Sequence, residues 1–251
     1  MEMVILTAIG VGGATVFGSV LGFLFRKISH RFSDIVLSFA AGVMLCAAVT
    51  GLILPSLEYA SPAPLLISVA GIFCGALCLN LMDKLVPHLH RLAGADQEEH
   101  PQITAKRNKV LLFVMAIAIH NLPEGIAAGV GFGSGNNAQA LTNAAGIALQ
   151  NIPEGMVIIA PMLAAGMTPG RTFLCALATG LVEVAGTLLG YCAVSISTAI
   201  LPFALAFAGG TMLYVISDEM IPETHHGDTR GATYSLLAGF CLMLAMGYFL
   251  E

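Results

Sequence analysis

Two segments of the chain carry nearly the same set of polar residues: residues 120–125 read HNLPEG and residues 150–155 read QNIPEG. In each copy the first position is four residues before the glutamate, and the asparagine is three residues before it. Side chains at these spacings lie on one surface of an α-helix, where they can converge on a shared ligand. The candidate ligands in the two copies are His120, Asn121, Glu124, Gln150, Asn151 and Glu154. This arrangement indicates cation binding by two neighbouring helices.

The types of these side chains indicate which cation they bind. Together with Glu183 in the next apolar segment, they supply one imidazole, three carboxylates and several amide oxygens. Such a set suits Zn, Fe, Mn, Co or Cd better than the all-oxygen surroundings preferred by Mg or Ca. Carboxylates held close together repel one another unless a proton or a cation neutralises them. Met44 either adds a thioether ligand that favours softer ions or fills the core, and the sequence leaves both options open.

Each copy of the motif contains a proline that disturbs the helix beside the ligands. Pro123 and Pro153 have no backbone N–H to donate to the carbonyls of Ile119 and Leu149, four residues earlier. We expect a kink at each proline. A carbonyl freed in this way is an additional oxygen donor, and inside a membrane it is tolerated only where protein surrounds it.

The elements that position these residues are predicted to be membrane-spanning helices. Hydrophobic residues make up 57% of the chain and charged residues only 10%, whereas soluble domains carry about 25% charged residues. Apolar stretches of about 20 residues are long enough to cross a bilayer. They fall near residues 4–25, 35–56, 64–85, 110–132, 139–162, 171–194, 201–222 and 231–250. The prediction is an all-α, polytopic membrane protein with eight transmembrane helices, forming one domain over residues 1–251 with a flexible cytoplasmic loop at about 86–109.

The positive charges give this arrangement an orientation. If both termini lie outside, all Lys and Arg residues fall in or next to the loops after spans one, three, five and seven. Those loops are then cytoplasmic, because positive residues concentrate on that side of a membrane. We therefore expect a multi-pass membrane protein with both termini outside, in contact with lipid and with no sign of nucleic-acid binding. The six cysteines fall within the spans, where we expect them to act as small apolar packing residues.

The chemistry-bearing residues share one depth in the predicted membrane. His120, Glu124, Glu154 and Glu183 lie within about one helical turn of the midpoints of their spans. An ionisable side chain at that depth costs at least about 2.5–3.5 kcal/mol, so four of them together indicate a function. The two motifs lie in consecutive spans that cross in opposite directions. This is a sign of an inverted repeat, which in transporters places the substrate near the midplane.

With these features, the sequence resembles the ZIP (Zrt-, Irt-like protein) metal transporter family, in particular its bacterial GufA-like branch. The resemblance covers the whole chain and rests on the paired motifs, on Glu183, and on the segment DEMIPE at residues 218–223. It implies eight spans arranged as three plus two plus three, with the fourth and fifth central. It also implies transport of zinc and related divalent ions, among them iron, manganese, cobalt and cadmium, towards the cytoplasm.

The resemblance also implies roles for individual residues. One metal is surrounded by His120, Glu124, Gln150 and Glu154 with Met44, and an adjacent second site uses Asn121, Asn151 and Glu183 and shares the two motif glutamates. The implied pathway residues are Glu58 at the outer entrance and Glu219, Glu223 and His225 at the inner exit, while His88 and His90 near the cytoplasmic surface are candidates for a metal relay. Asn151 stands where some members have a carboxylate and Asp218 where some have a histidine, which weakens the implied second site and any ligand role for Asp218.

Other classes of function have weaker support in the sequence. An intramembrane metalloprotease needs a His-Glu-x-x-His arrangement or its reverse, and neither occurs. No resident cofactor and no enzymatic activity are therefore expected. A metal-gated channel or a proton-coupled organic-ion carrier remains the alternative to a metal carrier that works by alternating access. The oligomeric state is open, with a homodimer as the alternative to a single chain.

Overall fold

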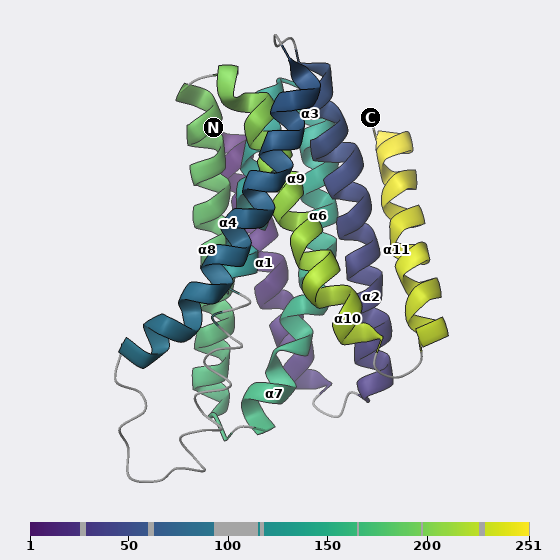
Figure 1. The fold of residues 1–251 in the computed structure, drawn as a ribbon. Helices are drawn as coiled ribbons and strands as arrows, with labels where there is room; N and C mark the ends of the chain where they lie inside the picture. Colours follow the sequence, from purple (N-terminus) through teal and green to yellow (C-terminus); the bar gives the residue numbers. More distant parts are fainter. Residues whose placement is uncertain are drawn as a thin grey trace.

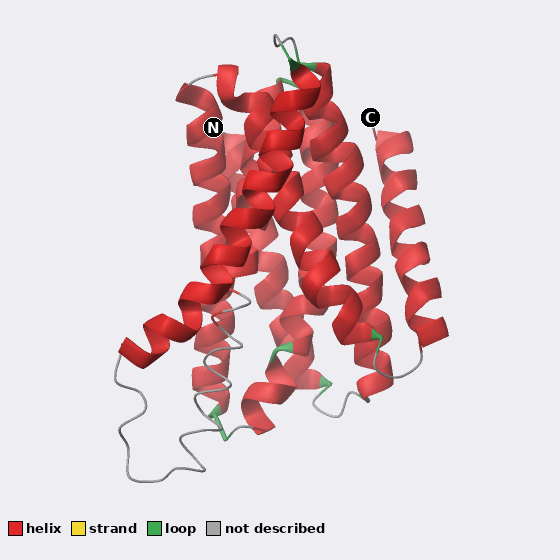
Figure 2. Ribbon diagram, viewed as in Figure 1, coloured by secondary structure: helices red, strands yellow, loops and turns green. Residues whose placement is uncertain are grey.

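The protein is a bundle of long helices that run side by side (Figure 1). A computed structural model describes residues 1–25, 29–59, 63–92, 115, 118–164, 166–196, 198–225 and 229–250. Within these ranges the chain is helical apart from short turns, and they contain no β-strand (Figure 2). The expectation of an all-α fold is therefore confirmed for the described part of the chain.

The long helices match the predicted spans closely. They are α1 (Glu2–Leu24), α2 (His30–Cys46), α4 (Pro64–Leu92), α6 (Asn137–Val157), α8 (Pro169–Ile196), α9 (Leu201–Val215) and α11 (Thr229–Leu250). The shorter elements are α3 (Leu54–Glu58), α7 (Ile159–Ala164), α10 (Ile221–Thr224), the π-helices η1 (Ala47–Ile53) and η4 (Ile216–Met220), and the 3-10 helices η2 (Phe132–Ser134) and η3 (Thr198–Ile200). The first motif lies in a helix over residues 118–131, which we call the first motif helix.

Seven helices within the described ranges are long and apolar enough to cross a membrane. They correspond to seven of the predicted spans. The remaining predicted span, 110–132, is described only at residue 115 and over the first motif helix. Helix α4 continues to Leu92, past the predicted end of its span at residue 85. Val86, Leu89 and Leu92 continue an apolar three-residue spacing that favours helix over loop. The rest of the predicted loop, residues 93–109, lies outside the described residues.

Close backbone contacts divide the helices into two groups. The motif bundle consists of α1, the first motif helix, α6 and α8. There a side chain at Gly18 would clash with the backbone of Ile152, and one at Gly125 would clash with the backbone of Glu183. The companion bundle consists of α2, α4, α9 and α11 together with η1, α3, η4 and α10, which continue α2 and α9. There Gly42 packs in the same way against the backbone of Leu236. Glycine allows this approach because it has no Cβ atom, and such contacts are typical of helices packed in lipid.

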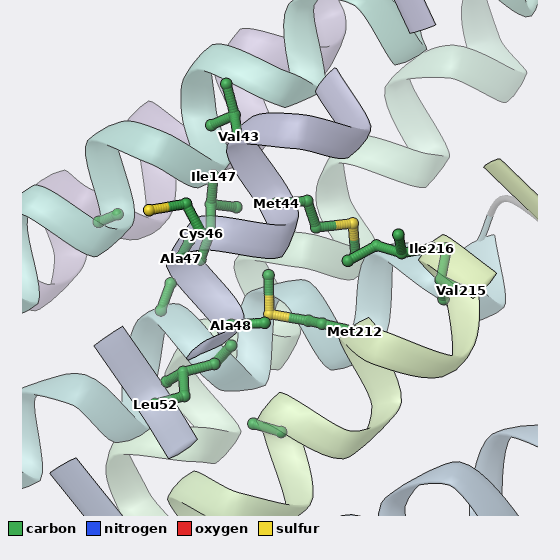
Figure 3. Close-up of a cluster of buried hydrophobic side chains, with 14 of the residues drawn as sticks. Val43, Met44, Cys46, Ala47, Ala48, Leu52, Ile147, Met212, Val215 and Ile216 are labelled. Atoms are coloured by element: carbon green, nitrogen blue, oxygen red, sulfur yellow. The ribbon is translucent and has the colours of Figure 1, made fainter. Parts of the chain in front are cut away.

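Contacts between the two bundles are of a different kind. Helix α6 packs against α2 and α11, but where Gly146 of α6 meets Met243 of α11 the neighbour is a flexible side chain. An apolar cluster lies at this interface, with Met44 of α2, Met212 of α9 and Ile147 of α6 among its members (Figure 3). The interface therefore relies on side-chain packing rather than on interlocked backbones.

The ends of the bundle differ in charge. The N-terminus and C-terminus lie at the same end, and α2, α8 and α11 begin at the opposite end (Figure 1). Arg31, Arg171 and Arg230 lie in the first turns of those three helices. The described cationic residues at helix starts thus gather away from the termini, as the predicted charge pattern requires.

Candidate metal centre

The most completely hydrogen-bonded group in the centre is the carboxylate of Glu183. It projects from α8 and is fully buried, with 0% of the residue exposed. One carboxylate oxygen accepts hydrogen bonds from the Thr15 hydroxyl at 2.7 Å and from the Asn121 amide at 2.5 Å. The other accepts one from the Asn151 amide at 2.7 Å. Glu183 thus links α1, the first motif helix and α6.

The carboxylate of Glu124 has the opposite character. Glu124 is 1% exposed, and within the described part of the chain neither of its oxygens has a hydrogen-bond partner. It interacts electrostatically with Glu154 and Glu183, which are also acidic. The Gln150 side chain lies beside it, yet the Gln150 amide makes no hydrogen bond of good geometry to any described residue. Burying an unpaired carboxylate is costly, and a cation between these side chains removes that cost.

His120 connects this centre to the companion bundle. Its Nε2 atom lies 2.7 Å from Oε1 of Glu219 in η4. Glu154 interacts electrostatically with both His120 and Glu219. Exposure increases along this series, from Glu124 at 1% to the Glu219 side chain at 36%. The polar groups therefore continue from the buried centre towards the η4 and α10 end of the bundle.

Both motifs thus contribute to one buried polar cluster, as the sequence predicts. However, among the residues that the structure describes, no three His, Cys, Asp or Glu side chains lie in an arrangement able to hold a metal ion. The amide groups therefore matter. The Oδ1 atoms of Asn121 and Asn151 and the Oε1 atom of Gln150 are buried, and no described residue hydrogen-bonds to them. These amide oxygens and the Glu124 carboxylate oxygens are therefore candidate metal ligands that no described residue engages in a hydrogen bond.

Met44 lies in apolar surroundings. It is fully buried, and Figure 3 shows its side chain directed towards Ile216 of η4. Its place in the apolar cluster fits the core-filling interpretation. A ligand role for Met44 stays a prediction.

The predicted pathway residues lie towards the two ends of the bundle. Glu58 is exposed in the last turn of α3, and Glu223 is exposed in α10. His225 follows α10, and its Nδ1 atom lies 2.8 Å from the carbonyl oxygen of Ile221. His88 and His90 lie in the last turns of α4, and their side chains are outside the described residues. Pathway roles for all of these residues stay predictions.

Sequence reasoning missed Thr15. Threonine is common in apolar helices because its hydroxyl can bond to the backbone of its own helix, so its type gives little signal. Its partner Glu183 lies 168 positions away. The one local hint is the run of small residues around it, since a helix that packs closely can bring a hydroxyl to a buried carboxylate.

Comparisons with known proteins agree with this architecture. The family model described as ZIP Zinc transporter matches residues 86–247. The zinc transporter GufA of Myxococcus xanthus is 42% identical over 202 residues, which are 78% of this chain and 78% of the relative. The zinc transporter ZIPB of Bordetella bronchiseptica is 39% identical, with 92% of this chain and 76% of the relative covered. The zinc transporter ZIP11 of Homo sapiens is 29% identical, with 93% of each covered. The chain therefore belongs to the ZIP zinc transporter family.

Proposed function

We propose that this protein carries divalent transition-metal ions, zinc foremost, across a bacterial inner membrane towards the cytoplasm. The observation that carries the proposal is the Glu124 carboxylate, which is buried beside Glu154 and Glu183 and receives no hydrogen bond of good geometry from any described residue, although the Gln150 side chain lies beside it. A dication supplies the charge that this cluster lacks. The names of the related zinc transporters support zinc as the first ion to test.

The bound ion takes its ligands from both motifs. Glu124 and Glu154 supply carboxylate oxygens, His120 supplies an imidazole nitrogen, and Gln150 supplies an amide oxygen. In the structure His120 contacts Glu219, so the imidazole has to exchange this partner for the ion. Imidazole and carboxylate ligands together suit zinc and its neighbours among the divalent metals.

The ion leaves the centre past Glu219. This direction is supported by the contact between His120 and Glu219 and by Glu223, which is exposed in the following helix α10. The cationic helix starts lie away from the chain termini, and cationic residues favour the cytoplasmic side. We therefore place the Glu219 side inside the cell, both termini outside, and the eighth span over residues 110–132.

Alternating access comes from movement of the motif bundle against the companion bundle. Glycine contacts such as Gly18 with Ile152 interlock helices within the motif bundle, so its helices move as one body. The interface with the companion bundle has few polar contacts in the described part of the chain, and one of them joins the Asn143 amide to the Gly51 carbonyl at 2.9 Å. Such an interface can be broken and re-formed at low cost.

Uptake by the purified protein in liposomes tests this function. Vesicles that enclose a fluorescent metal indicator are given Zn²⁺ alone, and then Zn²⁺ with an excess of Fe²⁺, Mn²⁺, Co²⁺ or Cd²⁺. We expect uptake above that of empty vesicles and inhibition by the competing ions that the centre accepts. Zn²⁺ accumulation equal to that of empty vesicles, with no uptake of the other ions, contradicts the proposal.

A further inference from the structure

Glu183 and its partners form a hydrogen-bonded unit that differs from the rest of the centre. Thr15, Asn121 and Asn151 all donate to the Glu183 carboxylate. Asn151 also lies within 3.3 Å of the backbone carbonyl of Val11, to which the same Nδ2 group donates. Glu183 therefore has three neutral donors from three helices, whereas Glu124 has none among the described residues.

The donors fix the orientation of the two amides. An ionised carboxylate only accepts hydrogen bonds, and each asparagine presents its NH₂ group, not its carbonyl oxygen, to Glu183. The positive ends of two amide dipoles and one hydroxyl proton thus occupy the space around this carboxylate. A metal ion there would meet N–H groups where it needs oxygen lone pairs. The chemistry of these residues does not fit the second metal that the family resemblance implies.

With their NH₂ groups directed at Glu183, the two asparagines have their carbonyl oxygens available as metal ligands. The Oδ1 atoms of Asn121 and Asn151 are buried and accept no hydrogen bond from any described residue. Both residues precede their motif glutamates, Glu124 and Glu154, by three positions and share a helix surface with them. An outer carboxylate that orients an inner ligand is a recurring feature of metal sites.

We propose that Glu183 is a positioning residue that binds no metal, and that the centre holds one ion in place of two. Thr15, Asn121 and Asn151 stabilise the Glu183 carboxylate by hydrogen bonds, and Glu183 in turn orients the two asparagine oxygens towards the ion held by Glu124 and Glu154. Thr15 is part of this device because it anchors Glu183 from outside the motifs. This inference rests on the proposed function and specifies how its centre is built.

Counting bound ions tests the proposal. Full-length protein in detergent, either wild type or Glu124→Ala, is equilibrated with Zn²⁺ and desalted. The number of zinc ions per chain is then measured by elemental mass spectrometry. Glu124 belongs to both implied sites, and surface histidines contribute equally to both samples, so the difference counts the ions in the centre. We expect a difference of one ion per chain. A difference of two overturns the inference but leaves the proposed function intact, whereas a difference of zero contradicts the proposed function itself.

Asn151→Asp provides a second count. The substitution replaces a donor with an acceptor next to Glu183, so the two carboxylates then need a proton or a cation between them, and excess Zn²⁺ above neutral pH favours the metal ion over the proton. We expect this variant to hold one more ion than the wild type. An unchanged count shows that amide donation is not what excludes the second ion, and contradicts the inference.

The role of Thr15 is tested with a matched pair of variants. Thr15→Val keeps the shape but removes the hydroxyl, while Thr15→Ser keeps the hydroxyl. We expect Thr15→Val to lower the affinity for Zn²⁺ by about 10-fold or more, as loss of an outer hydrogen bond does in metal sites, and to leave the ion count at the wild-type value. Thr15→Ser is expected to keep the wild-type affinity. Equal affinities for the two variants, or a changed ion count in Thr15→Val, overturn the positioning role.

Discussion

The imidazole of His120 and the carboxylate of Glu219 lie 2.7 Å apart and join the motif bundle to the companion bundle. His120 also belongs to the candidate metal centre, so its Nε2 atom can contact either Glu219 or a bound metal ion. In the proposed mechanism, a bound ion engages the imidazole and releases Glu219, and Glu219 contacts the imidazole again once the ion has left. We therefore expect this contact to couple ion occupancy to the interface between the bundles.

Replacing Glu219 should therefore slow transport more than it affects binding. We expect Glu219→Gln to reduce Zn²⁺ uptake by about 10-fold, corresponding to about 1.4 kcal/mol in the barrier to release, while the ion count stays at the wild-type value. Asp218→Asn is the matched control because Asp218 is exposed in the same π-helix. Similar uptake by Glu219→Gln and Asp218→Asn contradicts a pathway role for Glu219.

Acidification should weaken metal binding. The carboxylates of Glu124 and Glu154 bind a metal only when they are deprotonated, and protons compete for the same oxygens. Affinity therefore falls as the pH falls, and is greatest where both carboxylates are ionised. Calorimetric titration with Zn²⁺ from neutral to acidic pH measures this dependence. The contribution of Zn²⁺ binding to surface histidines is measured with Glu124→Ala. An affinity that stays flat on acidification contradicts carboxylate ligation.

The motif bundle should be sensitive to glycine substitution at its backbone contacts. A methyl group at Gly18 in α1 would clash with the backbone of Ile152, so we expect Gly18→Ala to destabilise the protein by about 1–3 kcal/mol. Gly13 of the same helix has nothing within 4 Å of an added methyl group, and Gly13→Ala should be neutral or slightly stabilising. Thermal unfolding in detergent compares the two variants. Equal melting temperatures would show that α1 is not interlocked with α6.

Linking the two bundles should stop transport. In a background without the six native cysteines, Gly146→Cys with Met243→Cys allows a short thiol-reactive cross-linker to join α6 to α11. Ser56→Cys with Ser68→Cys is the control, because those hydroxyl oxygens lie 2.8 Å apart within the companion bundle. We expect the first pair to lose most uptake on cross-linking and to recover it on cleavage of the link. Full uptake with the bundles linked contradicts their relative movement.

Much of the fold could be predicted from the sequence. Long apolar stretches of the right length define the helices because lipid leaves the backbone few alternatives to helical hydrogen bonding. The positions of the motifs within their spans placed Glu124 and Glu154 at one depth. Their meeting with Glu183 followed from the same reasoning, and the hydrogen bonds of Asn121 and Asn151 to Glu183 agree with it.

The features that the sequence could not reveal depend on contacts between distant helices. Thr15 reaches Glu183 only because glycines let α1 approach α6 and α8 closely. Glu219 was expected at the exit, and its contact with His120 depends on the path of η4. A π-helix changes the face on which later residues lie, and no pattern of residue types fixes where one forms. Helix α4 extends beyond the predicted span, since an apolar spacing continues among the polar residues that follow it.

Removing the charge of Glu124 tests most directly whether a transported metal ion binds at this centre. Glu124→Gln keeps the size of the side chain and removes only its charge, while Glu2→Gln makes the same change at an exposed position in α1. Zn²⁺ uptake into liposomes is measured for both variants and the wild type at equal protein content. We predict that Glu124→Gln loses at least about 100-fold in uptake, or about 2.7 kcal/mol, and that Glu2→Gln transports like the wild type. Wild-type uptake by Glu124→Gln would contradict the claim that a transported dication neutralises this buried carboxylate.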